Sequence, residues 1–466
     1  MTVQSIHKNL HQPSTPTHTP MTTPPTPPSI EQNTGITVYA TTTPGTGGII
    51  RQVPEDFIVE EITNREEQDL GKYLICTLKK KNWDTHHLVR DISRILHISQ
   101  QRIGWAGTKD KQALTTQKIS IYDMDPKELE RIRLRDVTLT AVGCSNKKVS
   151  LGDLWGNRFK IIVRQIALSV DEVDTMVDLT TAQIKAIDVV PNFFGIQRFG
   201  IQRPITHIVG RKLVEGDIEG AALLYIARPF PGESEKARQA RQYVLDTLDF
   251  KGGLGKFPLH LRYERAMMSR LVEKQGDYAG AFNALSPNLR KMFVHAYQSY
   301  LFNLILSRRL EKGLPINKAL QGDIVCFKNA AGLPDPTRIQ NVDEDTLDGI
   351  NNLLQRGRAF VTGPIIGYET PMSGGLSSEI EQAVIEEEQV DIKGFRIPAV
   401  PGLASKGLRR EIVIPVNPEY KVTEDKLNPG FTAVELEFDL QRGAYATTVL
   451  REYMKGDPAI NQFQKG

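Results

Sequence analysis

Short apolar runs, several of them alternating with polar residues, predict β-strands towards both ends of the chain. The predicted strands are Phe57–Glu61, Tyr73–Leu78, Ile103–Ala106, Gln117–Tyr122, Asn157–Val163 and Ala433–Leu440. Between them, Leu88, Ile92 and Leu96 recur at helical spacing after Thr85, which we expect to cap a helix.

The pattern changes towards helix over residues 217–417. Ser286, followed by a proline, predicts the start of a long helix, and Gly313 predicts its left-handed stop. Loops rich in glycine and proline then alternate with short strands such as Gln321–Cys326. We therefore expect a mixed α+β domain that is interrupted by an inserted, mainly helical domain.

Residues 1–46 are dominated by threonine, proline, serine and glutamine. A segment of this composition buries too little apolar surface to offset its ordering entropy, so we expect a disordered tail. A proline-rich ligand for a partner domain is the alternative. The tail gives no evidence of an obligatory protein partner.

Size and composition are those of an ordinary globular protein. A length of 466 residues suggests two or three folded units, and 40% hydrophobic residues suffice for their cores. Cys76, Cys144 and Cys326 lack the spacing of zinc or redox motifs, which favours a reducing compartment. With no apolar run of about 18 residues and no signal peptide, we expect a cytoplasmic protein without a membrane segment.

The net charge of +3 says little about nucleic acid, so local clusters carry more information. Three clusters stand out: Lys79–Lys81, Lys147–Lys148 and Arg409–Arg410. A charge run is usually a solvated face, and these become plausible contacts to an RNA backbone only where other residues indicate RNA chemistry.

Residues 105–112 read Trp-Ala-Gly-Thr-Lys-Asp-Lys-Gln and form the loop between two predicted strands. The loop places Asp110 between Lys109 and Lys111, and neighbouring cations favour the ionised form of a carboxylate. Taken alone, the pentapeptide Gly107–Lys111 would more simply be interpreted as a solvated turn. Other segments shift the balance towards a catalytic loop.

Five segments, in this order along the chain, resemble the motifs of the pseudouridine synthase D (TruD) family. They are Pro54–Glu61, Gly107–Asp110, Asn192–Gly200, His295–Asn303 and Gly443–Thr448. The resemblance implies a pseudouridine synthase catalytic domain with a mixed or antiparallel sheet, split by an α+β TRUD insertion. The corresponding expected boundaries are 47–216 and 418–466 for the catalytic domain and 217–417 for the insertion.

The resemblance also implies an enzyme that isomerises a uridine of tRNA, usually uridine 13 of the D arm. This reaction breaks the bond from N1 to C1′ and joins C5 to C1′, so we expect neither a cofactor nor a metal. Asp110 would act as the nucleophile at C1′ or as the base at C2′, and the sequence leaves both roles open. Arg51 occupies the family's basic position, commonly lysine, and we expect it and Lys109 near the substrate.

The resemblance assigns three further residues to substrate binding. Phe57 and Tyr445 match aromatic residues that stack on the extruded base, although an arbitrary buried aromatic is more often part of a core. Asn192 matches a substrate-site asparagine, whose amide can pair with a uracil edge or orient the aspartate. As a lone residue it would be interpreted as a turn or cap.

Other signals are weaker. The glycine-rich segment 252–257 lacks the spacing of a phosphate loop and predicts a flexible turn, and His295 is expected to be a hydrogen-bonded core histidine. Two rival functions stay open: a non-catalytic RNA-binding protein that retains the scaffold, and a metal-dependent nuclease, which would need clustered carboxylates.

Overall fold

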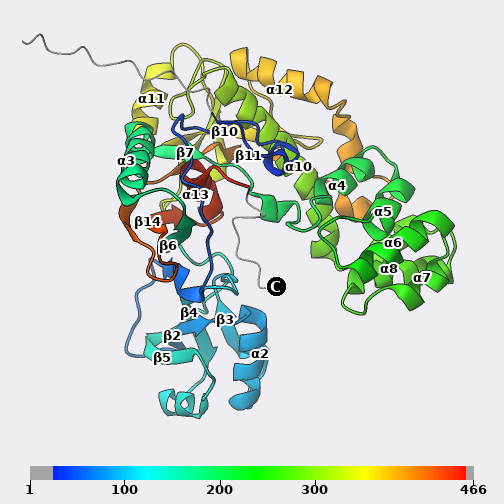
Figure 1. The fold of residues 1–466 in the computed structure, drawn as a ribbon, viewed down its shortest axis with the longest axis horizontal. Helices are drawn as coiled ribbons and strands as arrows, with labels where there is room; N and C mark the ends of the chain where they lie inside the picture. Colours follow the sequence, from blue (N-terminus) through cyan, green and yellow to red (C-terminus); the bar gives the residue numbers. More distant parts are fainter. Residues whose placement is uncertain (1–24, 458–466) are drawn as a thin grey trace, which may run out of the picture.

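A computed structural model describes residues 25–457. One lobe is built around a large sheet, and a second lobe, formed by α4 to α8, lies apart from the strands β2 to β5 of that sheet (Figure 1). A smaller sheet and the long helix α10 lie between them. Within residues 25–457 no helix is long and apolar enough to cross a membrane.

The large sheet is mixed and has the strand order β13-β14-β6-β1-β4-β2-β5, with β3 paired to β4. Its strands are β1 (Phe57–Ile62), β2 (Tyr73–Lys81), β3 (Ile103–Trp105), β4 (Leu114–Tyr122), β5 (Val137–Ser145), β6 (Gly156–Ile166), β13 (Glu419–Glu424) and β14 (Thr432–Gln441). Every pairing is antiparallel except that of β1 with β4. All six predicted strands are confirmed.

The two ends of the chain meet in this sheet. β14 pairs with β6, and β6 pairs with β1. Their apolar side chains on one face share a core with α3 (Val170–Ile187) and α13 (Ala446–Met454). Helix α2 (Thr85–Ile95) packs instead on β2, β3 and β4 through Leu88, Val89 and Ile92. Periodicity identifies these strands but cannot reveal their long-range pairing.

The insertion combines helices with a four-stranded sheet of order β11-β10-β8-β9. Its elements are α5 (Ile218–Ala227), α6 (Glu235–Thr247), α7 (Phe250–Lys256), α8 (Arg262–Glu273), α9 (Tyr278–Asn283), α10 (Pro287–Glu311), β8 (Ile324–Lys328), β9 (Pro334–Asn341), α11 (Leu347–Gln355), β10 (Ala359–Ile365), α12 (Gly375–Glu387) and β11 (Leu408–Glu411). Helix α4 (Thr206–Val214) shares their core, so this core begins upstream of the expected edge at residue 217. The short strands β7 (Val189–Pro191) and β12 (Val413–Pro415) pair beside the insertion.

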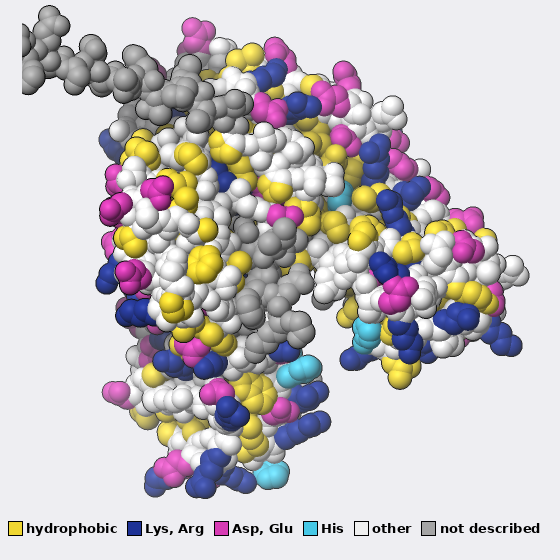
Figure 2. Space-filling view, viewed as in Figure 1, with side chains coloured by type: hydrophobic (Ala, Val, Ile, Leu, Met, Phe, Trp, Pro, Cys, Tyr) yellow, Lys and Arg dark blue, Asp and Glu magenta, His cyan; other side chains and the backbone are white. Residues whose placement is uncertain are grey.

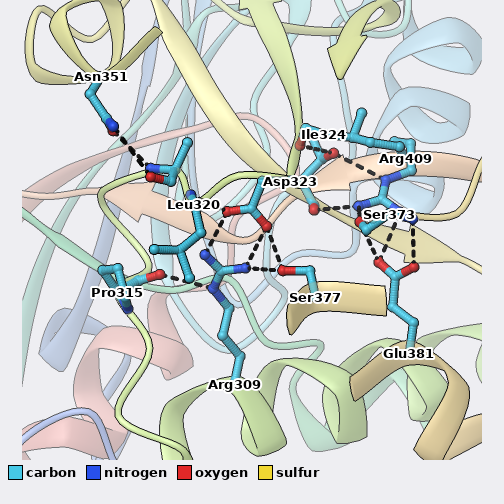
Figure 3. Close-up of polar contacts among 12 residues, drawn as sticks. Arg309, Pro315, Leu320, Asp323, Ile324, Asn351, Ser373, Ser377, Glu381 and Arg409 are labelled. Atoms are coloured by element: carbon cyan, nitrogen blue, oxygen red, sulfur yellow. Dashed lines mark hydrogen bonds and ion pairs between the residues drawn. The ribbon is translucent and has the colours of Figure 1, made fainter. Parts of the chain in front are cut away.

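Two buried ion pairs join α10, α12 and the smaller sheet (Figure 3). Arg309 makes a bidentate contact with Asp323, at 2.7 and 2.8 Å, and Arg409 lies 3.0 Å from Glu381. Arg409 is 1% exposed, so this member of an expected RNA-contacting cluster is an internal structural residue. Burial of its charge is possible because a carboxylate, hydroxyls and carbonyls surround the guanidinium.

The expected disordered tail does not extend to residue 46. Residues 25–46 include the short helix α1 (Ser29–Gln32) and run along α10 and α13, whereas residues 1–24 lie outside the described residues. Glu31 lies 2.9 Å from Arg451, and Glu452 accepts hydrogen bonds from the backbone of residues 40 and 41. Composition misled here because a few residues of the segment pack against distant parts of the chain: Ile36 and Tyr39 are buried, and charged side chains of α13 hold Glu31 and the backbone.

Two local predictions differ from the structure. Asp84, rather than Thr85, caps α2 by accepting a hydrogen bond from the backbone N–H of His87. The glycine-rich segment expected to be a turn forms α7, because Asp249 caps it through Gly252 and Phe250 is buried. The long helix α10 is confirmed, with Ser286 as its cap.

Arg451→Met tests the contribution of the charged cluster that orders the N-terminal segment. The arginine lies between two carboxylates, Glu31 and Glu452, that are 6% and 0% exposed. Leaving both without a countercharge should lower the free energy of unfolding by about 3–5 kcal/mol. Urea unfolding measures this, with the exposed Arg356→Met as control. Equal stability of the two variants would contradict the role of Arg451.

Candidate active site

Asp110 lies in the loop between β3 and β4, as predicted. Its Oδ1 accepts a hydrogen bond from the guanidinium of Arg51 at 2.7 Å. The Asp110 side chain is 41% exposed, whereas that of Arg51 is 10% exposed. Within residues 25–457, Oδ2 of Asp110 has no hydrogen-bond partner. The carboxylate is therefore held through one oxygen and accessible through the other.

Arg51 is held from two sides. Its backbone is left-handed, with φ of 64°, and its guanidinium carbon lies 4.0 Å from the centroid of the Phe57 ring. The cation is attracted by the ring face. The sequence predicted a basic residue near Asp110 and left the contact geometry open; the structure shows a single hydrogen bond rather than a bidentate one.

The two lysines expected beside Asp110 differ in their contacts. The side chain of Lys109 is 5% exposed, and its amine lies 3.0 Å from Glu61 and donates to Asn157 at 2.8 Å. Its charge is thus balanced by Glu61 rather than by Asp110. Lys111 is exposed. Arg51 is therefore the cation that Asp110 contacts.

A lysine outside the motif Gly107–Asp110 holds the backbone of the loop that carries Asp110. Lys80, fully buried on β2, donates hydrogen bonds from Nζ to the backbone oxygens of Asp110 at 2.9 Å and Trp83 at 2.7 Å. Burial lowers its pKa to about 8. Lys80 is therefore an internal residue and not one of the plausible RNA contacts of the cluster Lys79–Lys81. The alternation of β2, which turns residue 80 inward with Leu78, was the missed signal.

Asp110 lines a pocket of about 250 Å³, and the other lining residues come from both the N-terminal and the C-terminal parts of the chain. Phe57 and Phe159 contribute from neighbouring strands, with ring centroids 6.1 Å apart. Tyr445, half-buried, enters from the segment just before α13. The full lining is Arg51, Phe57, Val59, Thr108, Lys109, Asp110, Asn157, Phe159, Gln197, Ala444, Tyr445, Ala446 and Thr447. We call this the catalytic pocket.

The family comparison agrees with the motifs. The model of tRNA pseudouridine synthase D (TruD) matches residues 33–453. The chain belongs to this family. Membership makes it an RNA pseudouridine synthase, an enzyme that isomerises uridine.

Similar proteins cover nearly the whole chain. The probable tRNA pseudouridine synthase D of Methanosarcina barkeri is 56% identical over 431 residues, which are 92% of this chain and 98% of that protein. That of Pyrococcus furiosus is 41% identical over 419 residues, 90% and 98% of the two chains. The crystal structure of the putative TruD from Methanosarcina mazei has a TM-score of 0.87 and 55% identity, and covers 93% of this chain and 99% of that one.

Asn192, unlike the other expected site residues of this TruD-family chain, does not line the catalytic pocket. It is 2% exposed, and its amide donates to Glu411 at 3.0 Å and accepts from Arg410 at 2.7 Å. The residues that present amides to the pocket are Asn157 and Gln197. Gln197 lies within the third motif, so the sequence could have predicted it as a site residue. Asn157 lies outside all five motifs, and the sequence did not indicate its role.

Lys80→Met tests the support of the catalytic loop. The ordinary lysine pKa of 10.5 falls to about 8 on folding, so between these values the unfolded chain holds a proton that the folded protein has lost. Lys80 therefore raises stability as pH rises through this window. We expect the stability lost by the variant, measured by urea unfolding, to be larger at about pH 9.5 than at about pH 7.5. The exposed Lys79→Met is the control; a pH-independent difference would contradict this account.

Proposed function

We propose that this protein converts a uridine of tRNA into pseudouridine with Asp110 as the essential group. The proposed target is uridine 13 of the D arm, which is the usual target of the family. The observation that carries the proposal is the accessible Asp110 carboxylate, paired with Arg51, at a pocket lined by Phe57 and Tyr445. The reaction neither oxidises nor reduces the nucleoside. It needs only side chains that act as acid, base or nucleophile.

The pocket's contacts suit the chemistry of the bond exchange. The N1–C1′ bond breaks, uracil turns, C5 bonds to C1′, the proton of C5 is released, and N1 takes up a proton. Asp110 Oδ2, the oxygen that Arg51 leaves free, would act on the ribose as nucleophile at C1′ or as base at C2′. Arg51 offsets the negative charge of Asp110 when the polyanionic RNA approaches. Phe57 and Tyr445 would flank the extruded base, for which stacking returns about 1–3 kcal/mol.

Charge on the surface supports an RNA substrate. Helix α2 presents His86, Arg90 and Arg94 at intervals of four residues, each exposed or half-exposed. Figure 2 shows Lys, Arg and His side chains along the α2 edge of a hollow that separates this lobe from the helical lobe. Nε2 of His86 also lies 3.3 Å from Oγ1 of Thr108, which belongs to the loop that carries Asp110. Phosphate contacts along α2 would thus lead towards Asp110.

The expected cellular location follows from the substrate. Cys76, Cys144 and Cys326 are free thiols, which fits a reducing compartment. We therefore place the activity in the cytoplasm, where tRNA is used. Cell fractionation followed by detection of the protein would check this assignment.

Asp110→Asn is the main test. The variant keeps the size of the side chain but loses its charge, so the rate should fall by about 10²–10⁴-fold or more. Release of tritium from tRNA labelled at uridine C5 measures the rate, and filter binding measures affinity for the same tRNA. The exposed Asp69→Asn is the control. Tritium release at the wild-type rate by Asp110→Asn would remove Asp110 from the chemistry.

A tRNA in which uridine 13 is replaced by cytidine separates the target from the activity. We expect no pseudouridine in this RNA when its nucleosides are mapped after reaction. Pseudouridine at another position would refute the proposed target and leave the enzyme class intact. Binding of tRNA without any pseudouridine would favour the rival, a non-catalytic RNA-binding protein.

Substitutions of Arg51 test its electrostatic role. Arg51→Lys keeps the charge, and we expect it to retain activity within about tenfold, because an ammonium can still donate one hydrogen bond to Asp110 and be attracted by the Phe57 ring. Arg51→Gln removes the charge and should lower kcat by about 10–100-fold, in line with the loss of one hydrogen bond between charged groups. Single-turnover rates on saturating tRNA provide the comparison. Equal activity of the two variants would contradict a role for charge.

A further inference from the structure

A second and larger pocket, of about 490 Å³, adjoins the catalytic pocket. Its walls come from the third and fourth motifs and from the segment before β12. The lining is Phe194, Arg198, His295, Gln298, Ser299, Pro336, Ile365, Ala404, Ser405, Lys406, Gly407, Leu408, Arg409, Arg410, Glu411 and Gly443. We call this the motif pocket. Its volume is within the usual range for a pocket that binds an organic ligand.

The motif pocket and the catalytic pocket share one turn of chain. Gly443 lines the motif pocket, and the residues that follow it, from Ala444 to Thr447, line the catalytic pocket. Arg410 lies at this partition: its Nη2 donates to Asn192 at 2.7 Å and to the backbone oxygen of Gly443 at 3.4 Å. A ligand that fills both pockets therefore needs two groups joined by a short link, as in two adjacent nucleotides.

The motif pocket is cationic and has unused donors. Arg198 is fixed through Nε to Ser299 at 3.3 Å, and no partner for its Nη groups exists within residues 25–457. In the same range of residues, the imidazole of His295 has no hydrogen-bond partner and is exposed. This overturns the expectation of a hydrogen-bonded core histidine. Glu411, a lining carboxylate, is engaged by Asn192. These donors suit a phosphate.

Arg198 lies close enough to His295 and Arg410 to disfavour a positive charge on either side chain. Part of the His295 side chain is exposed, but partial desolvation by the surrounding protein lowers its pKa, and the charge of Arg198 lowers the pKa further. Burial likewise lowers the pKa of Arg410, and Arg198 adds to that effect. A phosphate between these side chains would relieve the repulsion.

The walls of the motif pocket are fixed in place. Gln298 donates to the backbone oxygen of Ile366 at 2.7 Å and to Ser405 at 2.9 Å. Behind the strand β11, the buried pair of Arg409 and Glu381 holds the segment that carries Arg410 (Figure 3). A preformed pocket needs little ordering on binding.

We propose that the motif pocket binds the nucleotide directly adjoining the target uridine, with its phosphate on Arg198 and His295. The inference rests on the proposed function and deepens it. A uridine extruded from folded RNA is unstacked from its neighbour, and the pocket beside the catalytic one offers that neighbour a place. The catalytic pocket then selects the uracil, and the motif pocket fixes its position along the strand.

Two variants and two altered RNAs test this. Arg198→Gln and His295→Gln remove phosphate donors, and the exposed Arg356→Gln is the control. The RNAs are tRNA with an abasic site on the 5′ side or on the 3′ side of the target. We expect Arg198→Gln to lower kcat/KM on intact tRNA by about 10–100-fold, in line with one or two lost charge-assisted hydrogen bonds. We expect a smaller loss for His295→Gln and none for Arg356→Gln.

The decisive result is the combination of protein and RNA changes. With wild-type protein, one of the two abasic RNAs should lose activity by a similar factor, because a nucleotide without its base is not seated in the motif pocket and does not bring its phosphate to Arg198. With Arg198→Gln that RNA should therefore lose little more. Fully multiplicative losses for both RNAs, or wild-type activity of Arg198→Gln, would overturn the proposal. Thermal unfolding checks that the variants are folded, and His295→Gln, at an exposed position, gives a second reading.

The same experiment separates this proposal from the proposed function. If wild-type protein forms no pseudouridine on intact tRNA, the proposed function fails. The affinity of the Asp110→Asn protein for intact and abasic RNAs then still measures the motif pocket. Binding that is weakened equally by Arg198→Gln on all three RNAs would indicate a general phosphate contact and refute a nucleotide site.

Discussion

The antiparallel pairing of β14 with β6 is the interaction on which the active site depends. It aligns Phe438 with Phe159, and β6 in turn aligns Ile161 with Phe57. This register brings the segment after β14, with Tyr445, to the pocket of the loop that carries Asp110. Without it the pocket would lack one wall. Because the pairing closes a very long loop, the insertion must fold in a way that leaves both of its ends near β6.

The insertion meets that constraint through its junction with the sheet domain. β7 and β12 pair at the point where the chain enters and leaves, and Phe193, Phe194 and Phe302 share a core there with Val413. The N-terminal segment adds a further tie: Asn303 on α10 donates to the backbone oxygen of Thr34, while Arg451 on α13 lies beside Glu31. One stretch of polar chain thus bridges the long helix of the insertion and the last helix of the catalytic domain.

Sequence patterns identified much of this molecule. The strands, the long helix and the loop of Asp110 follow from local periodicity and turn residues, and the motifs brought Phe57 and Tyr445 together. The residues that were missed depend on contacts across the fold. Lys80 is a surface lysine by composition and an internal one by its place on β2, and Asn157 becomes a pocket residue only once β6 lies beside β1.

Asn192 shows that a motif can also place a residue at the substrate when its contacts lie elsewhere. The motif assigned it to the substrate, and by residue type an amide could serve in either place. Its surroundings decide: the partition that it forms with Arg410 and Glu411 satisfies both ends of the amide and leaves it 2% exposed. No local pattern could have specified partners that come from the far end of the insertion.

The charges around the catalytic loop divide into two kinds. In two pairs the lysine is matched by a glutamate and not by the catalytic carboxylate: Lys109 contacts Glu61, and Lys81 contacts Glu55. The pair of Arg51 and Asp110 differs, because the cation is mostly buried while the carboxylate is exposed. A pair whose carboxylate is exposed is screened by water and contributes little to stability, so the stability of the fold does not account for holding Asp110 in this position. The arrangement makes sense for a group that must remain charged, stay in place and keep one oxygen available to a substrate.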